Sequence, residues 1–220
     1  MKKLTVLLGA VIAAALFVFA GCSDTQTFTQ KTYQSGDSRI ESIAIDVSDR
    51  QLQIVASEDE QVRVEYFDSE KEYLDISVSD DNKLTVSLIL DKEWTDFIGT
   101  KPSAEYRTIK VSVPDNVIVD LTAGTTNENI EVTGLSFAES VSLSSNGGSV
   151  ICNRVDVGKS IALTAKNGDI TGSVLGGWDD FTISCTIKKG DSNLPEYKEG
   201  GAKSFTADCN NGDIAIEFVK

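Results

Sequence analysis

Three aspartates occupy the same place in a recurring turn: Asp169 in "KNGDIT", Asp191 in "KKGDSN" and Asp213 in "NNGDIA". If these turns stack, their backbones lie about 5 Å apart, and glycoside hydrolysis needs two carboxylates roughly 5 to 9.5 Å apart. Carboxylates also bind hard cations such as Ca²⁺. Asp after Gly is ordinary turn chemistry as well. A structural corner, a weak cation site and a carbohydrate-active enzyme therefore remain alternative interpretations.

A second group combines acids with an aromatic side chain. Trp178, Asp179 and Asp180 lie in "GGWDDF", where the spacing between successive turns becomes longer, and insertions into one coil mark the binding face of repeat proteins. Trp94 lies in the irregular segment 91–104, which either caps the fold or forms an exposed contact. We predict these four side chains as candidate ligand contacts. For Trp178, folding back over the core is an equal alternative.

Other chemistry is excluded by residues that the chain lacks or spaces differently. There is no histidine, so a Ser-His-Asp triad and a Cys-His pair are impossible. Cys152, Cys185 and Cys209 lack the C-x₂-C spacing of thiolate metal sites, and no Walker-type phosphate loop occurs after Cys22. We therefore expect no catalytic residue, no cofactor and no dedicated metal site.

The N-terminus carries an export signal. Lys2 and Lys3 precede an apolar run that ends in "FAGC", with small residues before Cys22. This segment resembles the bacterial lipobox, which implies cleavage after residue 21 and acylation of Cys22 by chains such as palmitate. An uncleaved membrane anchor is the alternative. We interpret 22–38 as the lipidated Cys and a flexible polar tether, so the chain is expected on the extracytoplasmic side of the cell membrane.

The charge of the chain limits its partners. With 20 basic and 34 acidic residues, the net charge is −14, and removal of residues 1–21 leaves 18 basic residues and a net charge of −16. Nucleic acids and anionic membrane surfaces need neutralising lysines and arginines. We therefore expect no nucleic acid among the partners. The partners that remain are the membrane, through the lipid anchor on Cys22, and a cell-wall polymer or another envelope protein.

The residues between the turns repeat with a nearly fixed period. Triplets of inward-facing residues recur along the second half of the chain, and the residues between their members are mostly polar, as in strands with one buried face. A period of about 20 residues indicates a solenoid, in which stacked coils bury one apolar stripe. The triplets begin at Leu121, Val141, Ile161, Ile183 and Phe205.

The first half of the chain also alternates apolar and polar residues, in runs broken every 8–12 residues by acidic or Ser/Asn clusters. We therefore predict a single all-β domain over 39–220, a β-solenoid with coils of about 20–22 residues. Asn-Gly and Gly-Asp at the corners are expected to supply positive φ angles. Cys185 and Cys209 fall in offset columns of neighbouring coils, too far apart for a disulfide, so we expect free thiols.

The stretch "RTIKVSVPDNVIVDLTAGTTNENIEVTGL", with Val113-Pro114, is followed by "LTAKNGDITG" and "TADCNNGDIAIEF". Over residues 40–219 it resembles the bacterial putative-adhesin family of β-strand-repeat domains of unknown function. The resemblance implies a β-helix-like fold and offers no catalytic residues. We interpret the protein as a non-enzymatic surface-binding or scaffold module. An accessory of envelope stress sensing that binds a membrane protein, and a carbohydrate-active enzyme, are the alternatives.

Overall fold

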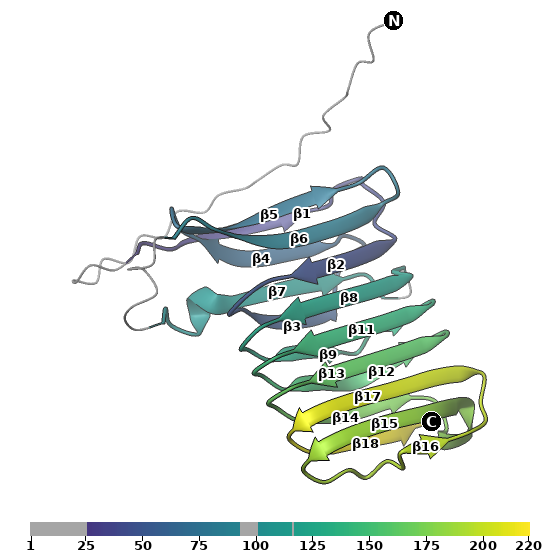
Figure 1. Ribbon diagram of the computed structural model, residues 1–220. Helices are drawn as coiled ribbons and strands as arrows, with labels where there is room; N and C mark the ends of the chain where they lie inside the picture. Colours follow the sequence, from purple (N-terminus) through teal and green to yellow (C-terminus); the bar gives the residue numbers. More distant parts are fainter. Residues whose placement is uncertain (1–25, 93–100, 116) are drawn as a thin grey trace, which may run out of the picture.

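The computed structural model describes residues 26–92, 101–115 and 117–220. Two mostly parallel nine-stranded sheets face one another and form a tall stack of coils (Figure 1). The described part also holds two short 3₁₀ turns, η2 (Glu105–Arg107) and η3 (Trp178–Asp180). The predicted all-β solenoid is confirmed.

In both sheets the spatial order of the strands differs from their order in the sequence. The first sheet has the order β1 (Thr29–Gln34), β4 (Arg63–Asp68), β7 (Thr108–Val113), β3 (Gln51–Ala56), β9 (Ile130–Thr133), β12 (Val150–Val157), β14 (Ile170–Leu175) and β18 (Ile214–Val219), with β10 (Ser136–Phe137) beside β12. The second has the order β16 (Tyr197–Lys198), β15 (Phe181–Lys189), β17 (Lys203–Asn211), β13 (Ser160–Ala165), β11 (Ser140–Ser145), β8 (Asp120–Thr125), β2 (Ser42–Asp46), β6 (Lys83–Leu90) and β5 (Glu72–Val78).

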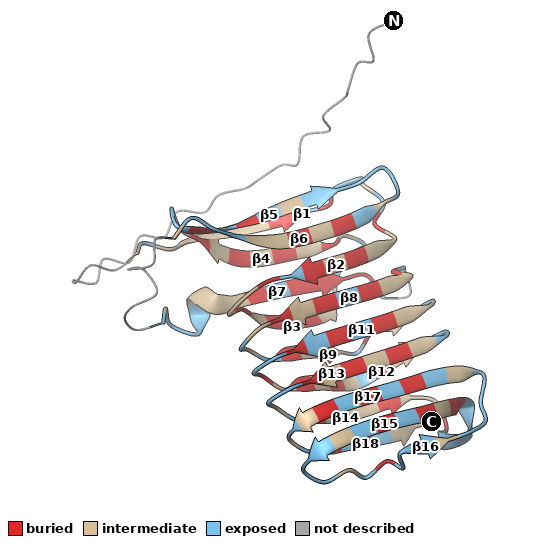
Figure 2. Ribbon diagram, viewed as in Figure 1, coloured by how far each residue is buried: buried red, intermediate tan, exposed pale blue. Residues whose placement is uncertain are grey.

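The core lies between the sheets and follows the period-two pattern of the sequence. In β11, Val141 and Leu143 are buried, whereas Ser142 and Ser144 face solvent. The same alternation crosses every central strand as bands of buried residues (Figure 2). Because each coil is in register with its neighbour, the inward residues form continuous apolar ladders from strand to strand.

The order of the last two coils differs from the expected one. The sequence suggests that Ile183 and Phe205 follow Ile161 in turn, but β17 lies between β13 and β15, so Phe205 is paired with both Ile161 and Ile183. The chain skips one position after β14, forms β15, the last parallel strand of the second sheet, and then fills the skipped position with β17 and β18. Alternation determines which residues face inward, but it does not determine which strand becomes the neighbour.

The chain makes the same detour at the other end. The coil formed by β2 and β3 is flanked on one side by β6 and β7 and on the other by β8 and β9. The chain therefore moves outward through β4, β5 and β6 before β8 returns to the far side of β2. Each end of the stack carries antiparallel pairs, β1 with β4 and β5 with β6 at one end, and β15 with β16 at the other.

The structure shortens the predicted tether. Residues 29–34 form β1, which pairs along its whole length with β4, although this segment was expected to be flexible. Only Tyr33 in β1 is an apolar, buried residue, so the strand is held mainly by main-chain hydrogen bonds. A polar strand of this kind leaves almost no signal in the hydrophobic pattern.

Glycines allow the corners of the coils to stack closely. A Cβ on Gly148 would lie 2.1 Å from the carbonyl oxygen of Glu128, and one on Gly168 would lie 2.4 Å from that of Gly148. The same approach recurs at Gly212 and Gly190. Positive φ was the expected reason for glycine, and it holds for Gly190 and Gly212, at +123° and +152°. At Gly148 and Gly168 the close backbone approach is the reason.

We expect Gly168→Ala to lower the free energy of unfolding by about 3 kcal/mol, because a Cβ there forces the stacked backbones apart. Gly124→Ala is the matched control, since a Cβ at Gly124 meets only ordinary contacts of 3.8–3.9 Å. Urea denaturation of the two variants measures the difference. Equal stability of the two variants would contradict the proposed role of the corner glycines.

A buried ion-pair cluster holds the N-terminal end together. Arg50 donates a hydrogen bond to Glu72, whose other carboxylate oxygen lies 2.5 Å from Lys92 Nζ. The side chains of Arg50 and Glu72 are 4% and 2% exposed. Burial by itself would raise the pKa of Glu72, but hydrogen bonds from Lys92 and Arg50 outweigh burial and lower that pKa overall.

We expect Glu72→Gln to destabilise the protein by about 3 kcal/mol at neutral pH, because Arg50 then remains buried without its countercharge. Since the folded-state pKa of Glu72 is lowered, its stabilisation is complete above the ordinary glutamate pKa and is lost as the pH falls through the folded value. Denaturant unfolding should therefore show that the difference in free energy of unfolding between wild type and Glu72→Gln becomes smaller at acidic pH. Glu70→Gln, an exposed neighbour, should leave stability unchanged at both pH values.

Candidate functional site

The three corner aspartates form a hydrogen-bonded ladder along the stack. Asp169 Oδ1 accepts the backbone N–H of Asp213 at 2.9 Å, and Asp213 Oδ1 accepts that of Asp191 at 2.8 Å. The order is therefore 169–213–191, not the predicted sequential one. The ladder continues backward through Ser149 Oγ, which accepts the N–H of Asp169, and Asn129 Oδ1, which accepts the N–H of Ser149.

This ladder gives the carboxylates of Asp169 and Asp213 a structural role, whereas Asp191 takes part through its backbone N–H. In Asp169 and Asp213, one carboxylate oxygen satisfies a backbone donor of the next corner, and a serine and an asparagine do the same in the preceding coils. Among the residues that the structure describes, no group of three or more His, Cys, Asp or Glu side chains is placed to hold a metal ion. The hydrogen bonds accepted by Asp169 and Asp213 thus give these two carboxylates a role in corner stabilisation.

We expect Asp213→Asn to be nearly neutral, because the amide oxygen can accept the same hydrogen bond. Asp213→Ala should cost about 1 kcal/mol, the usual value of one hydrogen bond. Thermal unfolding of both variants with calcium and with EDTA measures the effect. A calcium-dependent stabilisation of wild type that Asp213→Asn removes would contradict the structural role and restore the cation site.

Trp178 lies at the end of the stack farthest from β1, in η3. Its ring packs edge-to-face against Phe218, with centroids 5.4 Å apart, and Lys198 Nζ lies 5.5 Å from its centroid. Phe218 in turn contacts Phe181 and Phe205. Trp178 nevertheless keeps 41% of its surface exposed. Both interpretations of this residue are therefore partly right: one side covers the aromatic core, and the other faces solvent.

Asp179 and Asp180 serve separate purposes. Asp180 Oδ2 accepts the backbone N–H of Gly177 at 2.6 Å and so closes the η3 turn. The Asp179 side chain is 98% exposed and lies 3.9 Å from Lys198 Nζ. The Asp180 carboxylate is thus bound within the turn, whereas the Asp179 carboxylate extends into solvent. The two carboxylates therefore have separate roles.

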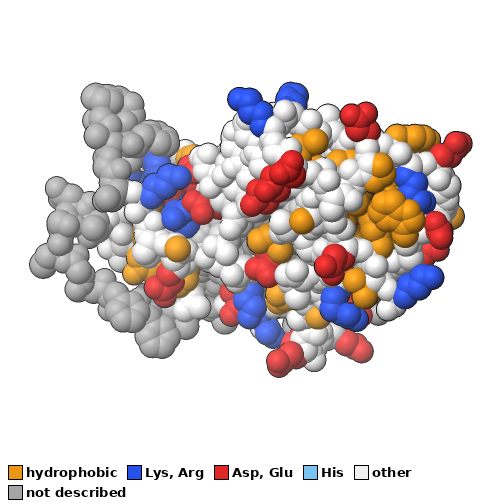
Figure 3. All heavy atoms as spheres, turned by 90° about the horizontal axis from the view of Figure 1, so that it is seen from below, with side chains coloured by type: hydrophobic (Ala, Val, Ile, Leu, Met, Phe, Trp, Pro, Cys, Tyr) orange, Lys and Arg blue, Asp and Glu red, His pale blue; other side chains and the backbone are white. Residues whose placement is uncertain are grey.

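Tyr197 completes this end of the molecule, and sequence reasoning missed it. It is 63% exposed, the largest value among the exposed large hydrophobic residues described, and it lies in the two-residue strand β16 next to Lys198. Viewed from this end, hydrophobic side chains gather at one side of the surface, with acidic and basic side chains around them (Figure 3). We call η3 and β16, with Trp178 and Tyr197, the distal end.

The edge of β18 at the distal end is partly covered by the preceding loop. The N–H of Ile214 donates to the carbonyl oxygen of Asp191. The Asn193 side chain accepts the N–H of Ile216 at 3.0 Å and donates to the Ile216 carbonyl oxygen at 2.9 Å. The amide thus replaces a neighbouring strand, and the first half of this edge is closed to further pairing.

A groove of about 610 Å³ lies where the loops 35–40, 57–62 and 114–118 meet. Its rim is acidic, and two of the rim carboxylates are hydrogen-bonded within the protein. The backbone N–H of Gln61 and the hydroxyl of Ser57 bind Asp59 and lower its pKa, and Asp115 Oδ1 accepts the N–H of Ser136. These carboxylates therefore hold the turns. The sequence pattern could not have found the groove, because the sheet pairing alone brings the loops together. The carboxylates at the groove are Asp37, Glu58, Asp59, Glu60 and Asp115.

The three described cysteines are free and buried, as predicted for Cys185 and Cys209. Cys185 is paired with Ala207, and Cys209 with Ile187, in the expected offset columns. Burial raises the pKa of Cys152 to about 12. The pKa of Cys209 is also raised, by burial and then by the charge of Asp169, so neither thiol is a ready nucleophile. Cys22 and Trp94 lie outside the described residues.

Comparison with known proteins agrees with this architecture. The sequence signature of the family described as Toastrack DUF4097 matches residues 40–220. The chain belongs to the Toastrack DUF4097 family. No curated protein matches the chain. The suspected relationship to β-strand-repeat domains of unknown function is thereby confirmed.

One solved structure has a fold similar to that of this chain, and others match it more weakly. A putative cell adhesion protein from Clostridium sporogenes superposes with a TM-score of 0.62 at 11% identity, covering 89% of this chain and 100% of the other. Putative adhesins from Bacteroides fragilis and Parabacteroides distasonis reach TM-scores of 0.35 and 0.33 at 12% identity. They cover 90% and 86% of this chain and 100% and 97% of their own. At 11% identity, the Clostridium sporogenes structure supports a similar fold and nothing further.

The Toastrack domain described here contains no helix that is both long and apolar enough to cross a membrane.

Proposed function

We propose that this Toastrack protein is a lipid-anchored extracytoplasmic module that binds an envelope polymer or another envelope protein through its distal end, without catalysis. The observation that carries this proposal is the placement of the two ends. The strand nearest the anchor, β1, terminates the first sheet at one end of the stack, whereas η3 and β16 lie at the other (Figure 1). The anchor therefore presents the distal end to a partner.

The anchor itself is inferred from "FAGC", which places Cys22 after an apolar export segment. Acylation at Cys22 by two or more chains would hold the protein stably on the membrane. The chain is already hydrogen-bonded to the domain at Gln26, so the linker is short. A short linker on a stiff stack suits a module that holds a contact surface at a fixed height above the lipid.

The composition of the distal end supports binding rather than mere solubility. Trp178 and Tyr197 are 41% and 63% exposed, and aromatic side chains of this kind anchor protein contacts and stack on sugars. Lys198 Nζ lies 5.5 Å from the centroid of the Trp178 ring and donates a hydrogen bond to the Phe181 carbonyl oxygen at 3.1 Å, which ties the ring to the end of the stack. The Clostridium sporogenes protein of similar fold is named a putative cell adhesion protein, which is consistent with this use of the fold.

We expect Trp178→Ala combined with Tyr197→Ala to lower binding to isolated envelope material at least about tenfold, because a lost aromatic contact typically costs about 1.4 kcal/mol or more. The full-length protein in detergent is incubated separately with purified cell wall and with solubilised envelope proteins. The retained fraction is then measured by sedimentation or affinity capture.

Val117→Ala is the matched control, since Val117 is 50% exposed and lies away from the distal end. Retention on cell wall that the double substitution removes supports a polymer-binding module. Retention only by one membrane protein favours the envelope-sensing accessory. Full retention by the double variant would rule out the distal end as the contact surface.

A further inference from the structure

Exposed apolar side chains also gather at the end nearest the anchor. Tyr73 in β5 and Ile89 in β6 are directly paired on the outer face of the second sheet and are 40% and 37% exposed. Leu90, the last residue of β6, is 43% exposed and lies on the opposite face, paired with the buried Glu72. We call Tyr73 and Ile89 the membrane-proximal patch. Adjacent exposed apolar side chains of this kind are candidate interaction sites.

The N-terminal segment joins the domain beside this patch. The Gln26 side-chain amide donates a hydrogen bond to Ser69 Oγ, which in turn accepts the backbone N–H of Glu72 at 3.0 Å. Glu72 immediately precedes Tyr73 and is paired with Leu90. The point at which the described chain begins and the membrane-proximal patch therefore lie next to one another.

The covalent reach of the chain limits how far the anchor can be from the patch. Cys22 precedes Gln26 by four residues, and four fully extended residues span at most about 14 Å. A Cys22 that is acylated and inserted thus holds the β5–β6 end within about that distance of the lipid surface. The distal end, at the opposite end of both sheets, has no such constraint.

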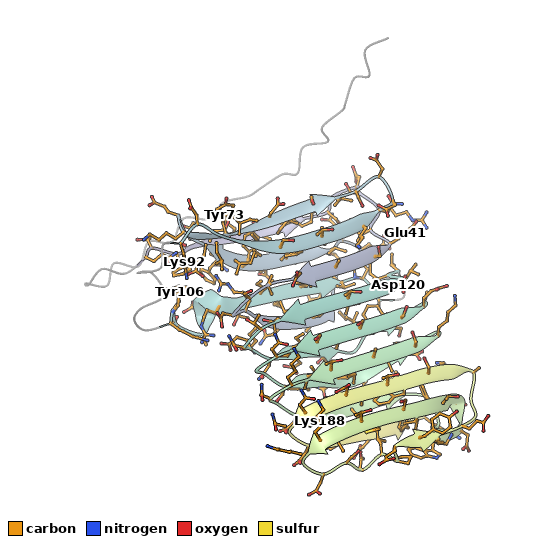
Figure 4. All side chains as sticks on the ribbon, viewed as in Figure 1. Glu41, Tyr73, Lys92, Tyr106, Asp120 and Lys188 are labelled. Carbon is orange, nitrogen blue, oxygen red and sulfur yellow. The ribbon has the colours of Figure 1, made fainter. Side chains whose placement is uncertain are left out.

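The other sheet carries aromatic side chains at the same end. Phe28, just before β1, stacks on Tyr106 of η2 with centroids 4.9 Å apart, and Phe67 of β4 meets Tyr106 edge-on at 5.3 Å. Figure 4 places Tyr73 and Tyr106 along the same edge of the N-terminal half. Aromatic residues with a polar tip favour the membrane–water interface, so this end has the composition of an interfacial surface.

We propose that Tyr73 and Ile89 contact the interfacial region of the bilayer into which the acyl chains on Cys22 insert. This inference rests on the lipid anchor of the proposed function and deepens it. A mature chain with 18 basic and 34 acidic residues, a net charge of −16, gains little from anionic headgroups, so the contact is apolar. Its effect is orientation: the anchor supplies affinity, and the patch turns the β5–β6 end toward the lipid, with Trp178 and Tyr197 at the opposite end of the stack.

A fluorescent probe can report this contact while the patch stays intact. Asp75 lies on the exposed face of β5, two residues from Tyr73, and Ser184 lies on the exposed face of β15 at the other end of the same sheet. The native thiols are buried, at most 4% exposed, so a dye labels Asp75→Cys or Ser184→Cys selectively. The full-length acylated protein is placed in phosphatidylcholine vesicles with and without nitroxide-labelled lipid.

We expect a blue shift and several-fold stronger nitroxide quenching at position 75 than at position 184. Tyr73→Ser with Ile89→Ser in the Asp75→Cys background should abolish the difference, because both residues are surface-exposed and their removal leaves the core intact. Equal quenching at 75 and 184, or quenching that survives the double substitution, overturns the proposal. A dye at position 75 that is already shielded before vesicles are added also overturns it, because the chain itself then covers the patch.

A vesicle flotation assay distinguishes failure of the lipid anchor from failure of the patch contact. Wild type should float with the vesicles, and residues 23–220 produced without the leader and without acyl chains should not. If wild type fails to float, the anchor is wrong and the membrane contact falls with it. If wild type floats but the probe at position 75 remains in water, only the patch is wrong.

Discussion

The close stacking of backbones at one corner of the coils is the constraint on which the rest of this protein depends. Four successive corners place a glycine where a Cβ would lie 2.1–2.4 Å from a carbonyl oxygen of the coil beside it. Next to each glycine stands a serine or an aspartate, whose N–H is accepted by the side chain at the same position of the neighbouring coil. The residues that most resemble an active site in the sequence are therefore those that hold the strands at hydrogen-bonding distance.

The sequence predicts faces better than it predicts neighbours. The period-two alternation assigned the inward residues of β8, β11 and β13 correctly, and the regular step between triplets placed them in register. It failed at β15 and β17, because both strands carry inward triplets that fit against β13 equally well by pattern. Which strand pairs with β13 depends on the path of the chain. The segment 190–202, which contains β16, returns the chain so that β17 lies between β13 and β15. The strand β1 was missed because backbone hydrogen bonds, and not apolar side chains, hold it.

The candidate site was only partly accessible to sequence reasoning for a related physical reason. Trp178 stands out by residue type, and its exposure could be anticipated from the inserted loop. Its packing on Phe218 could not, because Phe218 lies near the end of the chain and reaches Trp178 only after β18 has filled the gap beside β14. Tyr197 gave no signal, since a two-residue antiparallel strand is too short for any pattern.

The outward detours of the chain give the two ends of the solenoid different chemistry. A solenoid wound strictly in sequence order would leave two similar parallel edges, each able to pair with another copy. Here the antiparallel hairpin β5–β6 forms one end, and the charged Asp75 in the middle of its edge strand discourages further pairing, while β16 and the Asn193 amide cover much of the other end. With main-chain pairing restricted at both ends, contacts there depend on side chains. At the end near Cys22 these are aliphatic and tyrosyl, and at the distal end they are aromatic beside a lysine. This asymmetry lets one rigid stack face lipid at one end and a different partner at the other.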